Sequence, residues 1–224
     1  MTGKSSSNRY VAIMGDIVGS EKAADVEQLH VQFNRAVNES NAEGAQVLTS
    51  PLTITLGDEF QGLVNSLSAA FSLARKLRFK LLEDQIACRF AIGLVDLKSP
   101  INDQRAWNMM GEGLSQTRSK LNDKRAISFY RFALGGEPLL EPNLEALGVA
   151  LSTIERRWTD RQRRDIGAFL AGASASELAR QRNVSVHSIY KVRSSGDFDA
   201  YLLIFQTIME VLSHLDRQNG LPRC

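Results

Sequence analysis

Two short acidic motifs near the start of the chain have residue types and a spacing that suit metal chemistry. Asp16 follows an apolar run, within residues 15–20 (GDIVGS), and Asp58 lies beside Glu59, within residues 57–60 (GDEF). Two carboxylates that lie together repel each other unless a cation separates them, and hard oxygen ligands suit Mg²⁺ or Mn²⁺. Asp is also common at strand ends and hairpin tips, so a structural role for each residue stays open. The two motifs together predict a metal site at Asp16 and Asp58.

The glycine-containing loop after Asp16 has the character of a phosphate-binding loop. Backbone amides of residues 17–20 could cradle phosphates carried by the metal. Two ions bridging a triphosphate would neutralise the charge that develops during phosphoryl transfer. This part of the chain therefore predicts a metal-bound polyphosphate ligand, such as a nucleoside triphosphate.

A second chemistry is indicated by the charge distribution. The net charge of the whole chain is only +2, yet residues 151–195 carry nine Lys or Arg against four Asp or Glu. Such a basic block favours a polyanionic partner, although a solvated helical face is the alternative.

The basic block also has the pattern of a helix-turn-helix. Leu178 and Ala179 precede a turn at residues 183–185, and Ile189 begins a second apolar group, as in the DNA-binding ends of many bacterial regulators, which it resembles. The following helix would enter the major groove of double-stranded DNA, with these candidate contacts: Ser185, His187, Ser188, Tyr190, Lys191 and Arg193. Arginines on the preceding helices suit phosphate contacts: Arg161, Arg163, Arg164, Arg180 and Arg182. A plain helical bundle is the alternative.

Hydropathy patterns predict the elements that position the acidic motifs. Apolar runs or alternation indicate strands at residues 9–14, 52–56, 60–65, 88–94 and 126–132, and a 3.6-residue period indicates helices from residue 25, over 67–81 and over 107–121. The order is a βαββαβ unit, typical of an α+β, ferredoxin-like fold whose helices cover one face of an antiparallel sheet. Its first strand lies beside the hairpin, so Asp16 and Asp58 are expected to converge.

Composition excludes several classes of protein. With 43% hydrophobic and 23% charged residues, no apolar run long enough to span a bilayer and no secretory signal, we expect a soluble cytoplasmic protein. Two cysteines are too few for a disulfide framework, and Cys88, in an apolar run, is expected to be buried and inert. Three well-separated histidines argue against zinc. Trp107 and Trp158 are expected in the core.

The acidic motifs resemble a known family. Residues 15–20 and 55–62 (TLGDEFQG) are similar to the SatD family, and also to the palm core of class III nucleotide cyclases and, more distantly, to GGDEF domains. The resemblance implies metal ligands at Asp16 and Asp58 and the backbone carbonyl of Ile17. Residues 89–93 (RFAIG) resemble the cyclase strand that follows. Further candidates for nucleotide binding are Val18, Gly19, Ser20, Glu59, Arg118 and Lys120.

One departure from the cyclase pattern affects the expected activity. Ser115 stands where cyclases carry an Asn, and Arg118 and Lys120 flank the position of their Arg. Loss of those groups would remove transition-state stabilisation and leave metal–nucleotide binding intact. The resemblance therefore supports the fold more strongly than the reaction.

We expect four segments: a disordered N-terminus (1–8), a cyclase-like palm domain (9–135), a linker helix (136–157) and a helix-turn-helix region with a C-terminal helix (158–224). The apolar stripe of the last helix either packs on its own domain or forms the seam of a homodimer, which we favour slightly. The preferred function is a DNA-binding regulator with a metal- and nucleotide-binding palm. The alternatives are an active nucleotidyl cyclase or nucleotidyltransferase, and a degenerate palm that serves only as a dimerisation scaffold.

Overall fold

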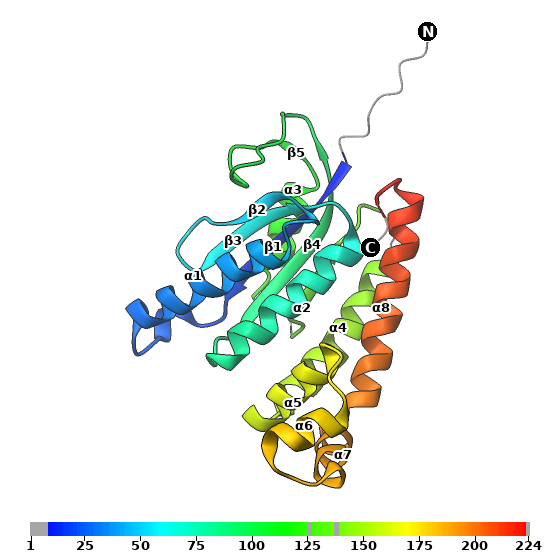
Figure 1. Cartoon of the computed structure of the whole chain (residues 1–224). Coiled ribbons are helices and arrows are strands. Elements are labelled where there is room, and N and C mark those ends of the chain that lie inside the picture. Colours follow the sequence, from blue (N-terminus) through cyan, green and yellow to red (C-terminus); the bar gives the residue numbers. More distant parts are fainter. Residues whose placement is uncertain (1–8, 125–126, 137–138, 223–224) are drawn as a thin grey trace.

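A central β-sheet organises the chain. The computed structural model describes residues 9–124, 127–136 and 139–222, so the expected disordered segment at residues 1–8 lies outside the described residues. The strands are β1 (Arg9–Ile17), β2 (Leu48–Ile54), β3 (Glu59–Val64), β4 (Cys88–Leu97), β5 (Gly111–Glu112) and β6 (Tyr130–Ala133). Their order is β2-β3-β1-β4-β5, and β6 pairs with β4 in parallel while the other pairs are antiparallel (Figure 1). The first motif therefore lies on a central strand, next to the hairpin strand β3.

The first half of the chain also forms three α-helices: α1 (Val26–Glu43), α2 (Leu67–Glu83) and α3 (Leu114–Asn122). Asp25 and Ser66 cap α1 and α2, each accepting from a backbone amide three residues on. The helix expected over residues 107–121 begins only at Leu114, after Gly113 at φ 91°. Trp107, expected in the core, is 53% exposed in the preceding loop, so that prediction is wrong.

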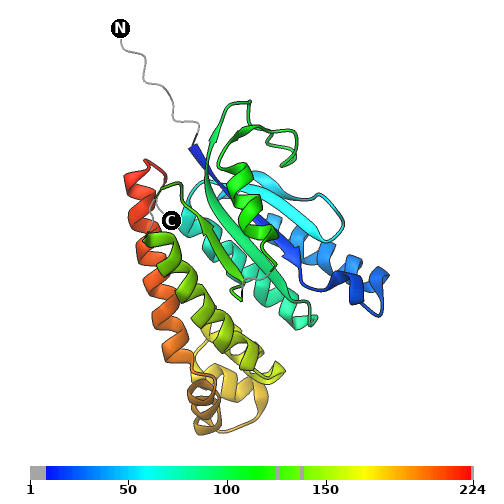
Figure 2. The ribbon, with the colours of Figure 1, turned by 180° about the vertical axis from the view of Figure 1, so that it is seen from behind.

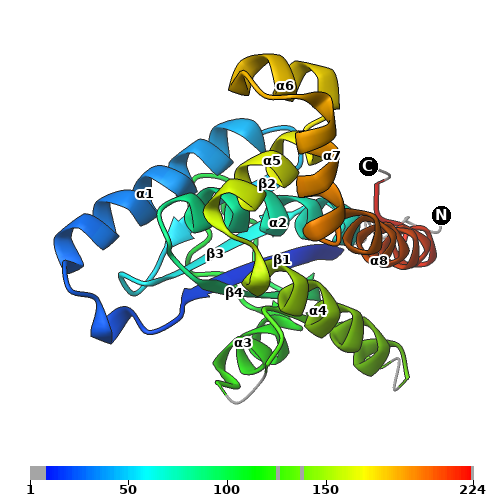
Figure 3. The ribbon, with the colours of Figure 1, turned by 90° about the horizontal axis from the view of Figure 1, so that it is seen from below.

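Helices cover both faces of the sheet. Val11 and Ile13 of β1 pack into the core shared with α1 and α2, whereas Ala12 and Met14 pack on the other side, where Leu121 of α3 lies. Figure 3 shows α1 and α2 on one side of the sheet and α3 on the other. The two helices of the βαββαβ unit therefore cover one face, as expected, and α3, which follows the unit, covers the other. Cover on both faces explains why β1 is apolar at consecutive positions.

Strand β2 tolerates a proline because it lies at an edge of the sheet. Pro51 stands inside β2, within the register shift between Ser50 and Thr53 in its pairing with β3. A residue without an amide hydrogen is accepted at such an edge or bulge. The strand consequently starts at Leu48, before the proline, whereas the hairpin pattern predicted a start after it.

The second half is helical: α4 (Leu140–Arg157), α5 (Asp160–Leu170), α6 (Ala175–Arg182), α7 (Val186–Ser195) and α8 (Phe198–Gln218). Helices α4 and α8 lie side by side and belong to the core of the sheet domain (Figure 2). Leu151 of α4 and Ile208 and Leu212 of α8 are fully buried there. The segment expected to be a linker is therefore a core helix, and the apolar stripe of α8 is used within its own chain rather than as a free dimer seam. Within the described residues, no helix has the length and apolar character to cross a bilayer.

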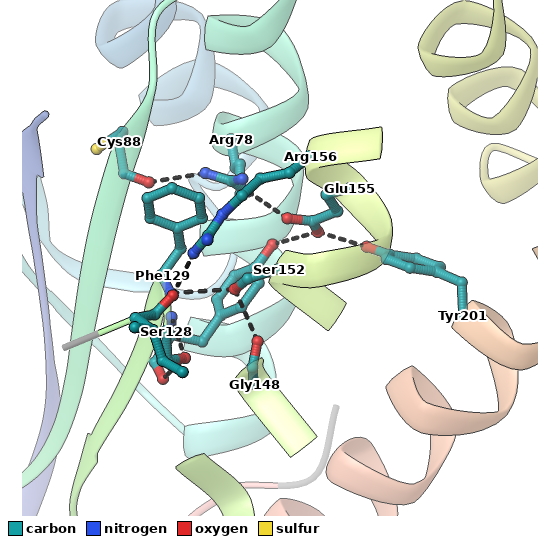
Figure 4. Close-up of polar contacts among 11 residues, drawn as sticks. Arg78, Cys88, Ser128, Phe129, Gly148, Ser152, Glu155, Arg156 and Tyr201 are labelled. Atoms are coloured by element: carbon teal, nitrogen blue, oxygen red, sulfur yellow. Dashed lines mark hydrogen bonds and ion pairs between the residues drawn. The ribbon is translucent and has the colours of Figure 1, made fainter. Parts of the chain in front are cut away.

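A buried polar network joins these elements (Figure 4). Arg78 Nε of α2 donates to Glu155 Oε2 of α4 at 2.5 Å, and the hydroxyls of Tyr130 and Tyr201 donate to Glu155 Oε1 at 2.9 and 3.0 Å. Arg78 also donates to the carbonyl of Cys88 at 2.9 Å. Burial, followed by the charge of Glu155, raises the pKa of both tyrosines well above the ordinary value, so both remain donors. One carboxylate thus holds together α2, α4, β6 and α8.

Helices α5–α7 form a smaller lobe with its own core, centred on Leu178, Ala179 and Ile189. Thr159, Ser174 and Ser185 cap the three helices, and each side chain accepts a hydrogen bond from the backbone amide three residues on. Local side-chain chemistry therefore defines this lobe.

Trp158 attaches the lobe to the sheet domain. Its indole Nε1 donates to the carbonyl of Gly196 at 2.7 Å, and its ring packs against Phe79 and Tyr201, with centroids 5.7 and 4.9 Å away. The prediction that Trp158 is a core residue is confirmed, because it is 3% exposed.

Candidate functional site

Asp16 lies within strand β1 rather than in the loop after it. It faces the α3 side of the sheet, paired in register with Glu59 on one side and with Arg89 on the other. Its carboxylate is nearly buried and forms an ion pair with Arg89 Nε at 3.0 Å, in an orientation that makes no hydrogen bond. Burial raises the pKa of Asp16, the charge of Arg89 opposes that rise, and Asp58 and Glu59 add to it. The nearest counter-charge to Asp16 is thus a guanidinium of the chain itself.

Asp58, at the hairpin tip, is tied to the loop after β1. Ser20 Oγ donates to Asp58 Oδ2 at 2.5 Å, and the amide of Ile17 donates to the Asp58 carbonyl at 3.0 Å. The two acidic motifs are therefore brought together, as the topology predicted. The contacts between them are hydrogen bonds of the protein itself.

The loop at residues 17–20 offers fewer amides than expected. The amide of Ile17 is used by Asp58, and the amide of Val18 donates to the carbonyl of Ala87 at 2.8 Å. Gly19 adopts φ 74° and leads into the short helix η1 (Ser20–Lys22). Of the four amides expected to bind phosphate, only those of Gly19 and Ser20 therefore remain as candidates.

The two basic candidates on α3 point to different places. Arg118 donates to Glu59 and to Gln61, both at 2.8 Å, and so lies beside the acidic motifs. Lys120 forms ion pairs with Glu141 and Glu145 of α4, at 3.1 and 2.7 Å, and so belongs to the contact between α3 and α4. Arg118 alone of these two is placed with the acidic motifs.

Arg118 also borders a small cavity under α3. The cavity has a volume of about 210 Å³ and is lined by Met14, Gln61, Leu63, Ser115 and Arg118 among others. Ser115, at the position where cyclases carry Asn, thus lies in the same wall as Arg118. The side chains from both motifs and from α3 share one face of the sheet.

The donor set provides a direct test of the metal prediction. Its oxygens are of the type that Mg²⁺ and Mn²⁺ prefer. However, the negative charge of Asp16 is already neutralised by Arg89, and that of Glu59 by Arg118. Within the described residues, no three His, Cys, Asp or Glu side chains are grouped as metal ligands. In this arrangement the residues do not fit a bound divalent cation, since one would have to displace Arg89.

On α7, the candidate DNA contacts divide into two groups. His187, Tyr190 and Lys191 are exposed, with Tyr190 at 52%, and no ion pair within the described residues involves Lys191. Ser185 and Ser188 bond to each other, with their hydroxyl oxygens 2.9 Å apart, and Ser185 Oγ accepts from the Ser188 amide.

Arg193, in contrast, is occupied within the protein. Its Nη2 is 2.5 Å from Asp199 Oδ1, and its guanidinium stands 4.8 Å from the ring centre of Phe198. This pairing places Arg193 at the junction between α7 and α8, and its contact with DNA stays a prediction.

A family model described as the SatD family matches residues 10–212. The chain belongs to the SatD family. The search of curated proteins found no match to it.

Solved structures similar to this SatD-family chain are nucleotide cyclases. A bacterial light-regulated adenylyl cyclase is 10% identical, with 55% of this chain and 42% of that chain covered and a TM-score of 0.39. The dimeric guanylyl cyclase domain of a RhoGC fusion protein from Blastocladiella emersonii is 12% identical, with 51% and 73% covered and a TM-score of 0.40. The guanylate cyclase domain from Catenaria anguillulae, solved with GTP, is also 12% identical, with 51% and 72% covered and a TM-score of 0.39. The chain thus spans less than half of the first of these proteins.

Two charged residues of this SatD-family chain were not among the sequence candidates. Arg89 lies opposite Asp16 in the register of β1 and β4, which neither strand reveals by itself. Asp165 of α5 is fully buried and lies 2.5 Å from Arg182 and 4.0 Å from Arg161. Burial raises its pKa, against the opposing charge of Arg182. Of the arginines expected to contact phosphates, Arg182 therefore holds α6 to α5, while Arg161 pairs within α5.

Proposed function

We propose that this SatD-family chain is a DNA-binding regulatory protein in which α5–α7 form a helix-turn-helix and α7 is the recognition helix. The observation that supports this most is the division of α7 into two faces. Ile189 is fully buried in the core of the lobe, while His187, Tyr190 and Lys191 project from the opposite side. A helix anchored by one face and polar on the other can place side chains in a major groove.

The charge around α7 supports the same proposal. Arg164 and Arg180 are exposed and form no ion pair within the described residues. Such side chains suit phosphate contacts, each of which adds about one unit to the salt dependence of binding. Arg161, Arg182 and Arg193 are excluded from this set because they pair with Asp165 or Asp199.

For the sheet domain we propose a ferredoxin-like palm that positions the helix-turn-helix. The strand order β4-β1-β3-β2 supports a ferredoxin-like fold. Helices α4 and α8, which precede and follow the lobe in the sequence, contribute side chains to the core of the sheet domain. Nucleotide binding through Gly19, Ser20 and Arg118 stays a prediction. The active-enzyme alternative needs a cation at Asp16, and the ion pair between Asp16 and Arg89 argues against one.

DNA binding can be tested by fluorescence polarisation with labelled random-sequence duplexes, titrated at several salt concentrations. We expect affinity to fall steeply between about 50 and 200 mM salt, and Lys191→Ala to weaken binding and lower the salt slope by about one unit. Lys98→Ala is the matched control, because Lys98 is an exposed lysine at the end of β4, paired with Glu112. Equal binding by Lys191→Ala and the unmodified protein would contradict the assignment of α7.

The enzyme alternative has its own test. The protein and its Asp58→Asn variant would be incubated with the four ribonucleotides and Mn²⁺, and the products analysed by mass spectrometry. A product that the variant does not form would replace the regulatory proposal by an enzymatic one.

A further inference from the structure

A groove separates the C-terminal half of α2 from α5, where the sheet domain meets the lobe. It has a volume of about 470 Å³, within the range of sites for small molecules. It lies away from the acidic motifs, and residues that border it include Arg75, Lys76, Phe79, Arg163, Arg164 and Ala168. The palm prediction does not use this groove, and the DNA-binding proposal shares one of its residues, Arg164.

The rim of the groove is cationic. Five Lys or Arg side chains line it against two carboxylates, those of Glu43 and Glu83. Glu43 is neutralised by Lys80, whose Nζ lies 2.8 Å from its Oε1. Lys76 and Arg164 are exposed and have no ion-pair partner within the described residues. The groove therefore presents positive charge that the protein itself does not balance.

Two further arginines in the rim have unsatisfied donors. The Nε atoms of Arg75 and Arg163 are buried and have no hydrogen-bond partner within the described residues. Arg75 is held over the ring of Phe205, 4.1 Å from its centre, and Arg163 Nη1 bonds to Asp160 at 3.0 Å. Because these Nε atoms are buried, a ligand in the groove would not reach them. The contacts with Phe205 and Asp160 instead hold the two guanidinium groups in place at the rim.

The floor of the groove is apolar. Phe79 of α2 faces Gly167 of α5, where even a Cβ atom would lie only 3.5 Å from Phe79 Cδ1, and Ala168 and Ala171 continue the wall. Small residues beside an aromatic ring leave a surface against which a planar group can stack. Inorganic phosphate would satisfy the rim but would leave this floor uncovered.

We propose that the groove between α2 and α5 binds a nucleotide, with its base against Phe79 and its phosphates held by Lys76 and Arg164. A groove of about 470 Å³ with an apolar floor suits a single small molecule better than a stretch of DNA backbone. A bound nucleotide would connect the sheet domain to the lobe and restrict movement of α5. This inference does not depend on DNA binding by α7.

Trp158 provides the readout, since its ring packs against Phe79, 5.7 Å between centroids. In a Trp107→Phe background, emission comes from Trp158 alone among the tryptophans of the chain. ATP, GTP and inorganic tripolyphosphate would be titrated separately with EDTA present, so that metal-dependent binding is suppressed. We expect a saturable change in emission with a nucleotide, at a concentration about tenfold below that needed for tripolyphosphate.

Paired variants locate the site. Lys76→Ala combined with Arg164→Ala should weaken nucleotide binding by at least about tenfold, and both residues are exposed, so the fold should persist. Lys98→Ala, at an exposed lysine at the end of β4, should leave binding unchanged. Loss of binding in an Arg118→Ala variant but not in the double variant would overturn the proposal, and so would equal affinity for tripolyphosphate and the nucleotides.

Discussion

The sheet domain and the α5–α7 lobe are held together in different ways. In the sheet domain, the decisive partners are far apart in sequence: Arg78 bonds to Glu155, and Asp216 of α8 accepts from the amides of Leu67 and Ser68, at 2.7 and 3.1 Å, at the start of α2. In the lobe, the capping boxes of α5 and α6 join residues only three apart. Long-range buried contacts produce one cooperative unit, whereas local contacts allow a segment to open by itself.

Glu155→Gln should have the largest effect, because it leaves the charge of Arg78 buried without its counter-ion. Breaking such a pair from one side costs about 3–5 kcal/mol, and urea denaturation should show this loss for the whole sheet domain. Arg157→Ala is the control on the same helix. Its ion pair with Asp197 is exposed, so its loss should cost less than about 1 kcal/mol. Similar losses in the two variants would remove the distinction between buried and exposed pairs.

Asp216→Ala should have the second largest effect. It removes a charged acceptor from two backbone amides and from Ser68 Oγ at the positive end of α2. Hydrogen bonds to charged groups contribute about 1.5–3 kcal/mol, so we expect a loss of about 2 kcal/mol in denaturation. Glu210→Ala, on an exposed position of the same helix, should change little. Hydrogen exchange should accelerate at Leu67 and Ser68 in the first variant only.

Thr159→Ala should cost about 1 kcal/mol, and the effect should be local. The substitution removes the acceptor for the Gln162 amide and one half of the capping box of α5. We expect faster hydrogen exchange in α5 while amides of α2 keep their protection. Thr159→Ser retains the hydroxyl and should restore the exchange rates. Faster exchange throughout the sheet domain would mean that the lobe does not open independently.

The smallest expected effect is a pH dependence at Asp16. Because its pKa is raised above the ordinary value of 3.8, chiefly by burial, the folded state binds this proton more tightly than the unfolded state. The resulting stabilisation is present at low pH and is lost as pH rises through the folded-state pKa. The stability of the unmodified protein relative to Asp16→Asn should therefore fall from about pH 4 upward and then level off. Urea denaturation of both proteins over this range measures the difference, and the opposite slope would contradict the raised pKa.

The same contrast explains what could be predicted from the sequence. Caps at Thr159, Ser174 and Ser185 are local signals, and they identify the helices of the lobe with nearly correct bounds. In the sheet domain, the strand order and the convergence of Asp16 and Asp58 follow from topology. The partner of Asp16 does not, because pairing with Arg89 depends on the register of two strands far apart in sequence.

Two other features could not be predicted from the local sequence pattern for the same reason. The apolar stripe of α8 has the same period whether it faces a second chain or its own core, so the sequence left both interpretations open. The loop that contains Trp107 mimics a helical pattern, and only Gly113 marks where the helix can begin. The burial of Cys88 was easier to predict, because the residue lies in an apolar strand. Burial raises the pKa of its thiol to about 12.

The contact between Asp216 and the start of α2 has a consequence for how the protein is made. During translation, Leu67 and Ser68 leave the ribosome about 150 residues before the carboxylate that they bond to. The sheet can pair earlier, but its covering layer stays incomplete until α8 has emerged. The lobe needs only neighbouring residues and can fold in the meantime. We therefore expect the order of folding to differ from the order of synthesis, with the helices of the lobe complete before the domain that precedes them.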